Sequence, residues 1–292
     1  MDNSRMVIRP PSEAGSFLLP VTFGCSHNKC TFCGTYPGMK LGIRPAVDIL
    51  RDIDEAARGY SWGIKRVFLE EGDALIYPHR RLVEVLNHLN KKFPRLERVG
   101  TYATPKAALI KTADQMKELK ELGLKIVFMG VETGDEELLR KIDKGATYAQ
   151  VVEAGRKVKQ AGITLSVTVI LGLGGIEGSR THSVNTARIL TDIDPDFAGA
   201  LTLMLVPGTP LHRDWQEGRF QLISPFQSLE ELKLIIEHSS FTRCFFTANH
   251  ASNYLPIKVY LPEQKEEVLK MIGEVLATKD MSRLRPEFIR AL

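Results

Sequence analysis

Three of the four cysteines of this chain, Cys25, Cys30 and Cys33, stand within nine residues and follow the apolar run 17–23 directly. A strand that ends in such a loop can present three thiolates to one metal centre. A [4Fe–4S] cluster is usually held by four cysteine thiolates, so three would leave one iron open to another ligand. The spacing therefore predicts an iron–sulfur cluster that these three cysteines bind, with one coordination position available for catalysis.

Three alternatives to a catalytic cluster stay open for these cysteines. A structural zinc site needs four ligands, often as two C-x₂-C pairs, and His27 is the only histidine inside the loop. The thiols could instead be buried without a metal. A cluster that only transfers electrons would need Cys244 as its fourth ligand.

The overall composition sets broad limits on function. The 292 residues carry a net charge of +4 without a block of Lys and Arg, so charge gives no support for nucleic-acid binding but leaves it open. No apolar run approaches the roughly 20 residues that a membrane helix needs, and the N-terminus lacks a signal-peptide core. The clustered cysteines do not resemble a secreted disulfide framework. We therefore expect a cytoplasmic protein that does not contact a membrane.

Apolar strands alternate with amphipathic helices through the first two thirds of the chain. Strands are predicted at 17–23, 66–69, 99–103, 125–131, 163–171 and 198–206, and helices at 44–58, 78–92, 112–122, 148–161 and 181–191. This α/β alternation predicts a partial (β/α)6 TIM-like barrel over 17–212, with its site at the carboxyl ends of the strands. We expect 213–292, with a helix at 262–278, to form a mostly helical extension packed on the barrel as one structural unit.

Polar and glycine-rich segments follow several of the predicted strands. Glu71–Asp73 follows the second strand, Gly130–Gly134 and Lys144 follow the fourth, and Gly172–Gly175 follows the fifth. Together with the cysteine loop, these segments resemble those of the radical S-adenosylmethionine (SAM) superfamily, in particular its elongator-protein-, MiaB- and HemN-like branches. The resemblance covers about residues 17–212 and implies the radical SAM type of partial barrel.

The resemblance implies which residues bind SAM, although two motifs depart from the family pattern. The usual loop is C-x₃-C-x₂-C, whereas the first gap here has four residues, and the Gly-Gly-Glu-like segment keeps only one glycine. An ordinary turn with a capping Asp73 is the alternative for that segment. By analogy, Glu132 lies near the ribose and Lys144 near the SAM carboxylate. The full set of predicted SAM-binding residues is Phe32, Gly72, Asp73, Tyr102, Glu132, Lys144, Thr168 and Val206.

The resemblance also implies an enzymatic activity. SAM would occupy the open iron, and an electron from a donor such as flavodoxin or ferredoxin would cleave it to a 5′-deoxyadenosyl radical that acts on a substrate. The sequence shows no second cysteine cluster and no RNA-binding accessory domain after the barrel, which favours a small-molecule substrate. Two alternatives stay open: a non-enzymatic cofactor-binding chaperone or carrier of HemN-like type, and an RNA- or protein-modifying enzyme that works with a partner.

The segment 249–254, Asn-His-Ala-Ser-Asn-Tyr, has four hydrogen-bonding side chains in six residues. One interpretation is a loop that hydrogen-bonds its own backbone. In the other, His250 and Tyr254 face the substrate as proton donors or hydrogen-atom relays, and they are our candidate catalytic residues. We expect Cys244 to be a buried structural thiol, with a thiyl precursor or second-cluster ligand as alternatives. The sequence assigns no role to His182.

Overall fold

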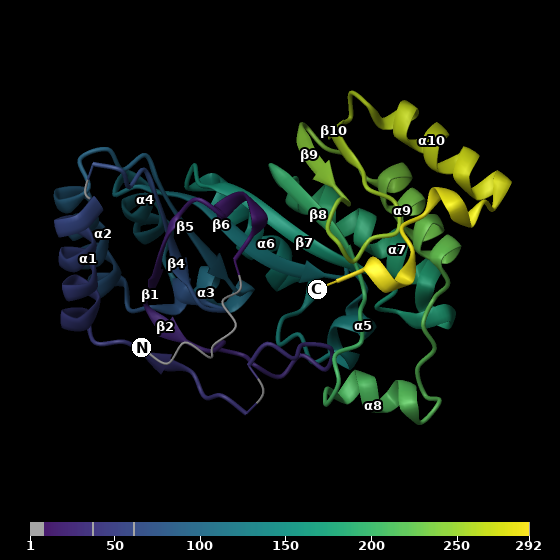
Figure 1. Cartoon of the computed structure of the whole chain (residues 1–292), viewed down its shortest axis with the longest axis horizontal. Coiled ribbons are helices and arrows are strands. Elements are labelled where there is room, and N and C mark those ends of the chain that lie inside the picture. Colours follow the sequence, from purple (N-terminus) through teal and green to yellow (C-terminus); the bar gives the residue numbers. More distant parts are fainter. Residues whose placement is uncertain (1–8, 37, 61, 292) are drawn as a thin grey trace. The chain divides into compact units, whose positions relative to one another are not determined.

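The computed structural model describes residues 9–36, 38–60 and 62–291 (Figure 1). The chain forms two compact units. The first consists of Met1–Asn28, Thr35–Met129 and Glu153–Leu165, and the second of Lys29–Gly34, Gly130–Val152 and Ser166–Leu292. The predicted domain boundary after residue 212 falls inside the second unit, so the division into barrel and extension stays a prediction.

The strands of the first unit are mainly parallel. In hydrogen-bonded order they are β1 (Phe17–Pro20), β4 (Arg66–Glu70), β5 (Arg98–Ala103) and β6 (Leu124–Glu132), and the last three residues of β6 belong to the second unit. A separate antiparallel pair joins β2 (Thr22–Phe23) to β3 (Gly42–Ile43). The single strand predicted over 17–23 is therefore wrong. The chain leaves the parallel sheet after Pro20, so that β2 pairs with the segment that follows the cysteine loop.

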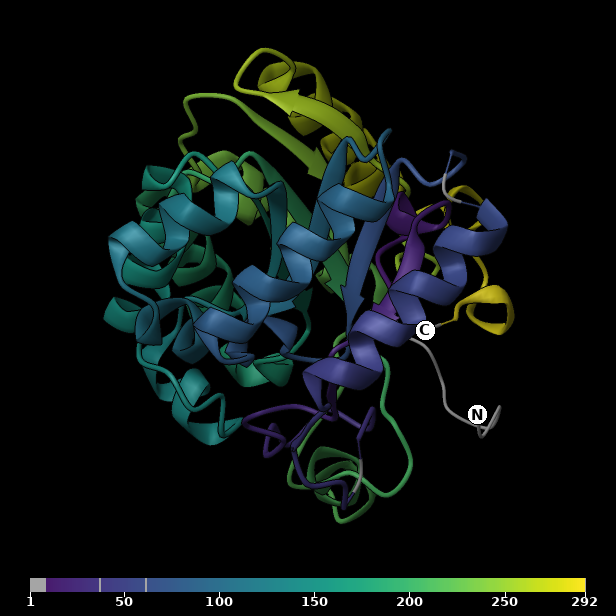
Figure 2. The ribbon, with the colours of Figure 1, turned by 90° about the vertical axis from the view of Figure 1, so that its left-hand side faces the viewer.

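Amphipathic helices cover the parallel strands of the first unit. They are α1 (Ala46–Tyr60), α2 (His79–Lys92), α3 (Pro105–Ile110), α4 (Ala113–Glu121) and the later part of α6 (Tyr148–Gln160), with short 3-10 turns η1 (Pro11–Glu13) and η2 (Ala74–Ile76). Figure 2 shows α1 and α2, in blue, packed along one another. Their fully buried residues, such as Ile49 and Ile53 in α1 and Leu82 and Leu86 in α2, recur every four residues, as an apolar helix face requires.

The strands of the second unit continue the α/β pattern. β7 (Thr164–Leu171), β8 (Phe197–Thr202) and β9 (Cys244–Thr247) are parallel, and β10 (Lys258–Leu261) runs antiparallel to β9. The first two residues of β7 belong to the first unit. Residues along β7 alternate between half-buried and buried, so that Val167 and Val169 lie on one, buried face of the strand and Thr168 lies on the other. β8 ends at Thr202 rather than at 206; residues 203–206 have no regular secondary structure and lead into a turn closed by the Thr209 N–H on the Val206 carbonyl.

The α-helices of the second unit are α5 (Glu136–Lys141), α7 (Gly175–Ile193), α8 (Pro210–Gln216), α9 (Pro225–His238) and α10 (Lys265–Thr278), followed by η3 (Met281–Arg283) and η4 (Glu287–Ile289). Three of these five α-helices, α5, α8 and α9, begin at residues whose side chains cap the helix. Ser224 and Gln227 form a capping box at the start of α9, and Thr209 caps α8. α7 begins six residues before the predicted helix at 181–191, and α3 and α5 were not predicted.

The predicted fold class is confirmed: the strands are mostly parallel and alternate with helices. The C-terminal part is mostly helical as expected, but it also contributes β9 and β10. β9 lies beside β8 with Phe197 opposite Phe245, so the segment after the last predicted strand adds to the sheet of the second unit.

Candidate functional site

The three cysteines of the predicted cluster loop are accessible. Cys25 and Cys30 are half-buried and Cys33 is exposed, whereas Cys244 is buried. Cys25 belongs to the first unit, and Cys30 and Cys33 belong to the second. Across the described ranges, no group of three or more Cys, His, Asp or Glu side chains is arranged to hold a metal ion. The ligand set therefore stays a prediction. Its chemistry fits an iron–sulfur cluster, because all three donors are thiols that the fold leaves accessible.

Asp73, a predicted SAM-binding residue, has its carboxylate engaged inside the first unit. The side chain is fully buried and accepts hydrogen bonds from the Ser26 hydroxyl and from the backbone N–H and hydroxyl of Thr104, the last two at 2.9 Å. Burial raises the pKa of Asp73, and the bonds from Ser26 and Thr104 oppose that rise. The side chain makes no capping bond to η2, which follows it. Asp73 therefore connects Ser26, next to Cys25, to the N-cap of α3.

Gly72 lies directly against the cysteine loop. A Cβ added there would be 2.7 Å from Tyr36 Cε2 and 3.1 Å from Cys25 Cβ, so there is no room for a side chain. Tyr102, also predicted to bind SAM, is half-buried on β5, with its ring edge-on to Phe68 at 5.1 Å. Burial raises the pKa of Tyr102, so its hydroxyl stays protonated at neutral pH.

The part of the loop that carries Cys30 and Cys33 is held by the second unit. Thr31 N–H donates to the Ile142 carbonyl at 2.9 Å, and the Thr31 carbonyl accepts from Leu211 N–H at 3.0 Å. Phe32, the predicted aromatic neighbour of the cluster, packs on an apolar cluster that includes Ile142 and Leu211. The residue that follows α5 and the first turn of α8 thus fix this half of the loop.

Gly34 and Val206 are in close contact in the second unit. A Cβ on Gly34 would lie 2.4 Å from Val206 Cγ1, so only glycine allows the loop to approach this closely. Val206, a predicted SAM-binding residue, therefore lies beside the cysteine loop. The predicted residue Thr168 is half-buried, on the face of β7 opposite to that of Val167 and Val169. Its contact with SAM stays a prediction.

Glu132 and Lys144 form an ion pair at the end of β6. Lys144 Nζ lies 2.7 Å from Glu132 Oε1, and the two side chains are only 10% and 11% exposed. Glu132 has a φ of 67°, which is strained for a residue with a side chain. Gly130 lies under the pair, since a Cβ there would be 2.1 Å from Glu132 Oε1. The two residues that the resemblance assigned to SAM are therefore held together by the protein.

A buried hydrogen-bond network connects the segments that follow β6 and β7. Thr133 Oγ1 lies 2.8 Å from His182 Nδ1, and His182 Nε2 donates to the Ile170 carbonyl at 3.0 Å. Glu231 Oε2 accepts from Gly172 N–H at 2.7 Å and lies 3.8 Å from His182 Nε2. The network fixes the backbone at Ile170 and Gly172, where β7 ends and the glycine-rich segment Gly172–Gly175 begins.

The sequence pattern did not reveal either titratable side chain of this network, His182 or Glu231. Burial lowers the pKa of His182 to about 4 and raises the pKa of Glu231 to about 7. His182 is therefore neutral at pH 7, and the neutral imidazole can donate to one partner and accept from the other. One feature of the sequence could have indicated that Glu231 has a buried partner. Glu231 lies on the apolar face of α9 between Leu229 and Leu232, where an unpaired carboxylate would be costly.

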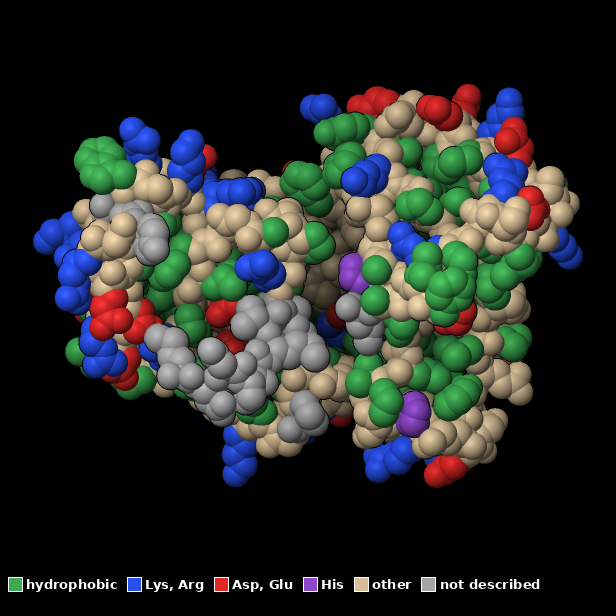
Figure 3. Space-filling view, in the orientation of Figure 1, with side chains coloured by type: hydrophobic (Ala, Val, Ile, Leu, Met, Phe, Trp, Pro, Cys, Tyr) green, Lys and Arg blue, Asp and Glu red, His purple; other side chains and the backbone are tan. Residues whose placement is uncertain are grey.

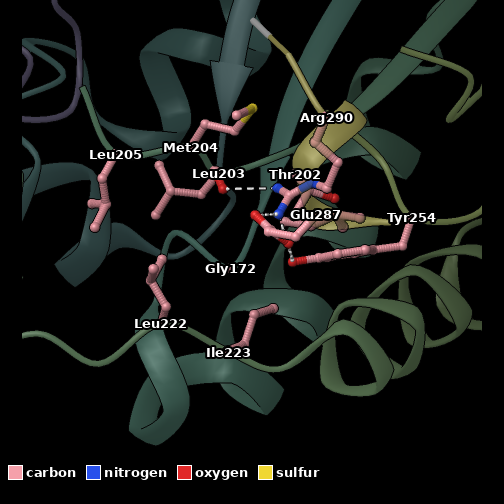
Figure 4. Close-up of a pocket in the computed structure, with 11 residues that line it drawn as sticks. Gly172, Thr202, Leu203, Met204, Leu205, Leu222, Ile223, Tyr254, Glu287 and Arg290 are labelled. Atoms are coloured by element: carbon pink, nitrogen blue, oxygen red, sulfur yellow. Dashed lines mark hydrogen bonds and ion pairs between the residues drawn. The ribbon is translucent and has the colours of Figure 1, made fainter. Parts of the chain in front are cut away.

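A pocket of about 400 Å³ opens at the carboxyl ends of β7 and β8 (Figure 4). Its lining includes Gly172, Leu203, Tyr254 and Arg290. The Arg290 side chain is 3% exposed, and its guanidinium lies 4.1 Å from the centre of the Tyr254 ring. Tyr254 donates to Glu287 Oε2 at 2.8 Å, and Arg290 donates to both. The polar groups of the wall are therefore paired with one another.

The segment 249–254 makes hydrogen bonds within itself and to β8, and its catalytic role stays a prediction. Asn253 is buried, donates to the Ala200 carbonyl at 2.8 Å and accepts from Thr202 Oγ1 at 2.9 Å, so it attaches the loop to β8. His250 Nδ1 accepts from Ser252 N–H at 3.1 Å. Burial and, to a smaller degree, Arg285 lower the pKa of His250. Tyr254 lines the pocket, and His250 is not among the lining residues.

Cys244 lies far from the loop segment of the second unit. It begins β9 beside the first residues of β8 and opposite Leu261, whereas Thr31 contacts the segment that follows β8. The six residues of β8 span about 20 Å at about 3.3 Å per residue. This register argues against Cys244 as the fourth ligand of the cluster.

Comparison with known proteins identifies the class. A match to the Radical SAM superfamily covers residues 19–182, and the chain belongs to that family. Over 188 residues it is 24% identical to the heme chaperone HemW of Bacillus subtilis, an alignment that covers 60% of this chain and 48% of the relative. Coproporphyrinogen III oxidase (HemN) from Escherichia coli is similar in structure, with a TM-score of 0.59, 17% identity, and coverage of 76% and 51% of the two chains. Methylornithine synthase (PylB) is also similar in structure, with a TM-score of 0.53, 20% identity, and coverage of 77% of this chain and 63% of that chain.

Family membership confirms several predictions at the level of the class. The chain belongs to the predicted superfamily, which is a family of enzymes. The cofactors of this family are the predicted [4Fe–4S] cluster and SAM. The chain spans about half the length of the heme chaperone that it matches, so the activity of a whole relative does not transfer to it.

Two surface properties bear on possible partners. No helix in the described part of the chain is both long and apolar enough to cross a membrane. On the face drawn in Figure 3, Lys and Arg side chains are spread over the surface with acidic side chains between them. The described residues on this face form no continuous basic area of the kind that typically binds nucleic acid.

Proposed function

We propose that this chain is a radical SAM enzyme that holds a [4Fe–4S] cluster through its three loop cysteines and cleaves SAM reductively to act on a small molecule. The observation that carries the proposal is the family match over residues 19–182, which contains the entire cysteine loop and the Glu132–Lys144 pair. When bound, the cluster and SAM supply one-electron chemistry that breaks a carbon–sulfur bond of SAM. A small redox protein such as flavodoxin or ferredoxin is the proposed electron donor.

The residues of this chain have binding and orienting roles in the proposal. Lys144 offers an ammonium group to the SAM carboxylate, and Glu132 accepts a hydrogen bond from the ribose. Their partial burial supports these roles, because charged hydrogen bonds are stronger where water is scarce. The backbone beside Gly72 and the side chains of Thr168 and Val206 are further proposed contacts.

The size of the pocket supports a small-molecule substrate. About 400 Å³ lies within the usual range for small-ligand sites, and two structural neighbours, methylornithine synthase and coproporphyrinogen III oxidase, are named for chemistry on small molecules. We retain Tyr254 as a candidate proton donor because it lines the pocket. Burial and its hydrogen bond to Glu287 raise the pKa of Tyr254 to about 12, so it carries its proton at pH 7. His250 is proposed as a candidate of the same kind on sequence grounds.

An anaerobic assay tests the reductive cleavage. Reconstituted protein with SAM and dithionite is expected to release 5′-deoxyadenosine and methionine, and Cys30→Ala is expected to release neither. Cys244→Ala is the matched control, because it removes a thiol outside the loop and should retain cleavage. Equal cleavage by Cys30→Ala and the wild type would contradict the assigned ligand set.

The substrate class can be tested with deuterium. The small-molecule, RNA and protein fractions of cells grown in D₂O are each added to the assay, and 5′-deoxyadenosine is examined by mass spectrometry. Deuterium is expected only with the small-molecule fraction. Its appearance with RNA or protein would instead support a macromolecule-modifying enzyme.

The similarity to a heme chaperone favours a second candidate function, a cofactor carrier. A carrier would bind hemin with a defined absorption spectrum and would release no cleavage product from SAM under reducing conditions. The enzyme proposal expects cleavage whether or not hemin is present.

A further inference from the structure

Glu71 adopts a backbone conformation that usually belongs to glycine. Its φ is 84°, and it stands directly after β4, where the radical SAM segment that it resembles carries glycine. A residue with a side chain is strained in this region, so the surrounding structure must stabilise it. Glu71 therefore replaces the glycine of the family pattern but keeps the backbone conformation that a glycine would adopt there.

The Glu71 carboxylate contacts both ends of the cysteine loop. Its Oε2 accepts a hydrogen bond from Gly24 N–H at 3.1 Å, immediately before Cys25, and the carboxylate is also hydrogen-bonded to the Tyr36 hydroxyl, three residues after Cys33. β2 and β3 pair just outside these contacts. One side chain thus closes the base of the loop.

Asp73 and Asn28 add contacts at the same base. Asp73 accepts from the hydroxyl of Ser26. Asn28, which lies in the four-residue gap between the first two cysteines, has a φ of 48°. Its Nδ2 donates to the carbonyls of Tyr36 at 2.7 Å and Met39 at 2.8 Å. The side chain of Asn28 therefore stabilises the gap that is one residue longer than usual.

We propose that Glu71, Asp73 and Asn28 form a loop clasp, a set of positioning residues that holds Cys25 in place for the cluster. This inference rests on the proposed function, because it assigns the clasp to the cluster loop. In this chain the segment after β4 acts on the loop through its side chains as well as its backbone. Gly72 lies between Glu71 and Asp73 in sequence. Because Gly72 has no side chain, Cys25 can pack against its backbone.

Glu71→Gly separates the clasp from general stability. The substitution removes the carboxylate that binds Gly24 and Tyr36 but also removes the strain at φ 84°, so the two effects on folding oppose each other. Glu71→Gln retains an oxygen that can accept a hydrogen bond, so this variant should hold the loop as the wild type does. Lys279→Gly is the matched control, because Lys279 has a φ of 49° at the end of α10 and lies in the second unit.

The main measurement is the rate at which a chelator removes iron from the reconstituted protein. Glu71→Gly is expected to lose iron about tenfold faster than the wild type, as the loss of a hydrogen bond to a charged group implies. Glu71→Gln and Lys279→Gly are expected to behave like the wild type. If Glu71→Gly does not fold, Tyr36→Phe removes one clasp bond and is expected to show a smaller increase. Iron loss at the wild-type rate from the folded variants would overturn the clasp.

A second readout needs no cluster. In metal-free protein, alkylation of Cys25 measured by peptide mass spectrometry should be faster in Glu71→Gly than in the wild type, with buried Cys244 as the internal reference. A wild type that binds no iron would overturn the proposed function, yet alkylation would still test the clasp. A wild type that binds a cluster, with equal iron loss and equal alkylation in Glu71→Gly, would overturn the clasp alone.

Discussion

Replacing Glu231 by glutamine should make the protein more stable at alkaline pH. Glu231 is fully buried, and burial raises its pKa from 4.5 to about 7 against the hydrogen bonds from Ser179 and Gly172 N–H. At about 1.4 kcal/mol for each unit of pKa shift, this rise corresponds to a loss of about 3 kcal/mol in the free energy of unfolding once Glu231 is ionised. Glutamine keeps an oxygen that can accept from Gly172 N–H but never ionises.

The sign of the effect follows from the protonation states. Below pH 4.5 Glu231 is protonated in the folded and unfolded states, so its ionisation costs nothing. As the pH rises from 4.5 to about 7, the unfolded state releases the proton first, and the wild type loses up to about 3 kcal/mol of stability. Above pH 7 the difference stays constant. Glu231→Gln should therefore gain stability relative to the wild type across this window.

Urea unfolding of the metal-free proteins at several pH values measures this difference. Glu230→Gln is the matched control, because it makes the same chemical change at the exposed neighbour of Glu231 on α9. Parallel stability curves for Glu231→Gln and the wild type from pH 4.5 to 8 would refute the buried, proton-binding role of Glu231.

Three further predictions concern other parts of the site. Gly34→Ala should destabilise the protein by about 1–3 kcal/mol in urea unfolding, because its Cβ would lie 2.4 Å from Val206 Cγ1; an unchanged midpoint would show that the loop moves without cost. Lys144→Met should raise the Kd for SAM about tenfold by calorimetry with reconstituted protein, since one charged contact is lost, and an unchanged Kd would remove Lys144 from the SAM site. Arg290→Lys should lower the free energy of unfolding by about 1–3 kcal/mol, because a single ammonium group cannot replace the guanidinium bonds to Tyr254 and to the backbone; unchanged stability would contradict that role.

The spacing of apolar residues made most of the fold predictable. Short elements, and elements whose position depends on distant partners, could not be predicted. The helices α1, α2 and α6 carry apolar residues at helical spacing, and β4, β5 and β7 are apolar runs between helices, so local sequence determines them. β9 is only four residues long, and its place beside β8 depends on partners far away in sequence. The split of the first predicted strand into β1 and β2 likewise depends on a partner, β3.

The candidate site was predictable where its chemistry needs rare residue types. The cysteine spacing and the Glu132–Lys144 element are visible because such patterns seldom arise from packing. The role of Glu71 was not visible, since a positive φ leaves no mark on the residue type. His182 and Glu231 were missed because they meet only after α7 and α9 pack together.

Electron paramagnetic resonance of the dithionite-reduced protein, recorded before and after SAM is added, tests the central claim most directly. The account predicts a [4Fe–4S]⁺ signal in the wild type and in Cys244→Ala, and a changed signal in both when SAM binds the open iron. A signal that SAM leaves unaltered, or one that disappears in Cys244→Ala, would show a cluster closed by four protein ligands and would contradict the account.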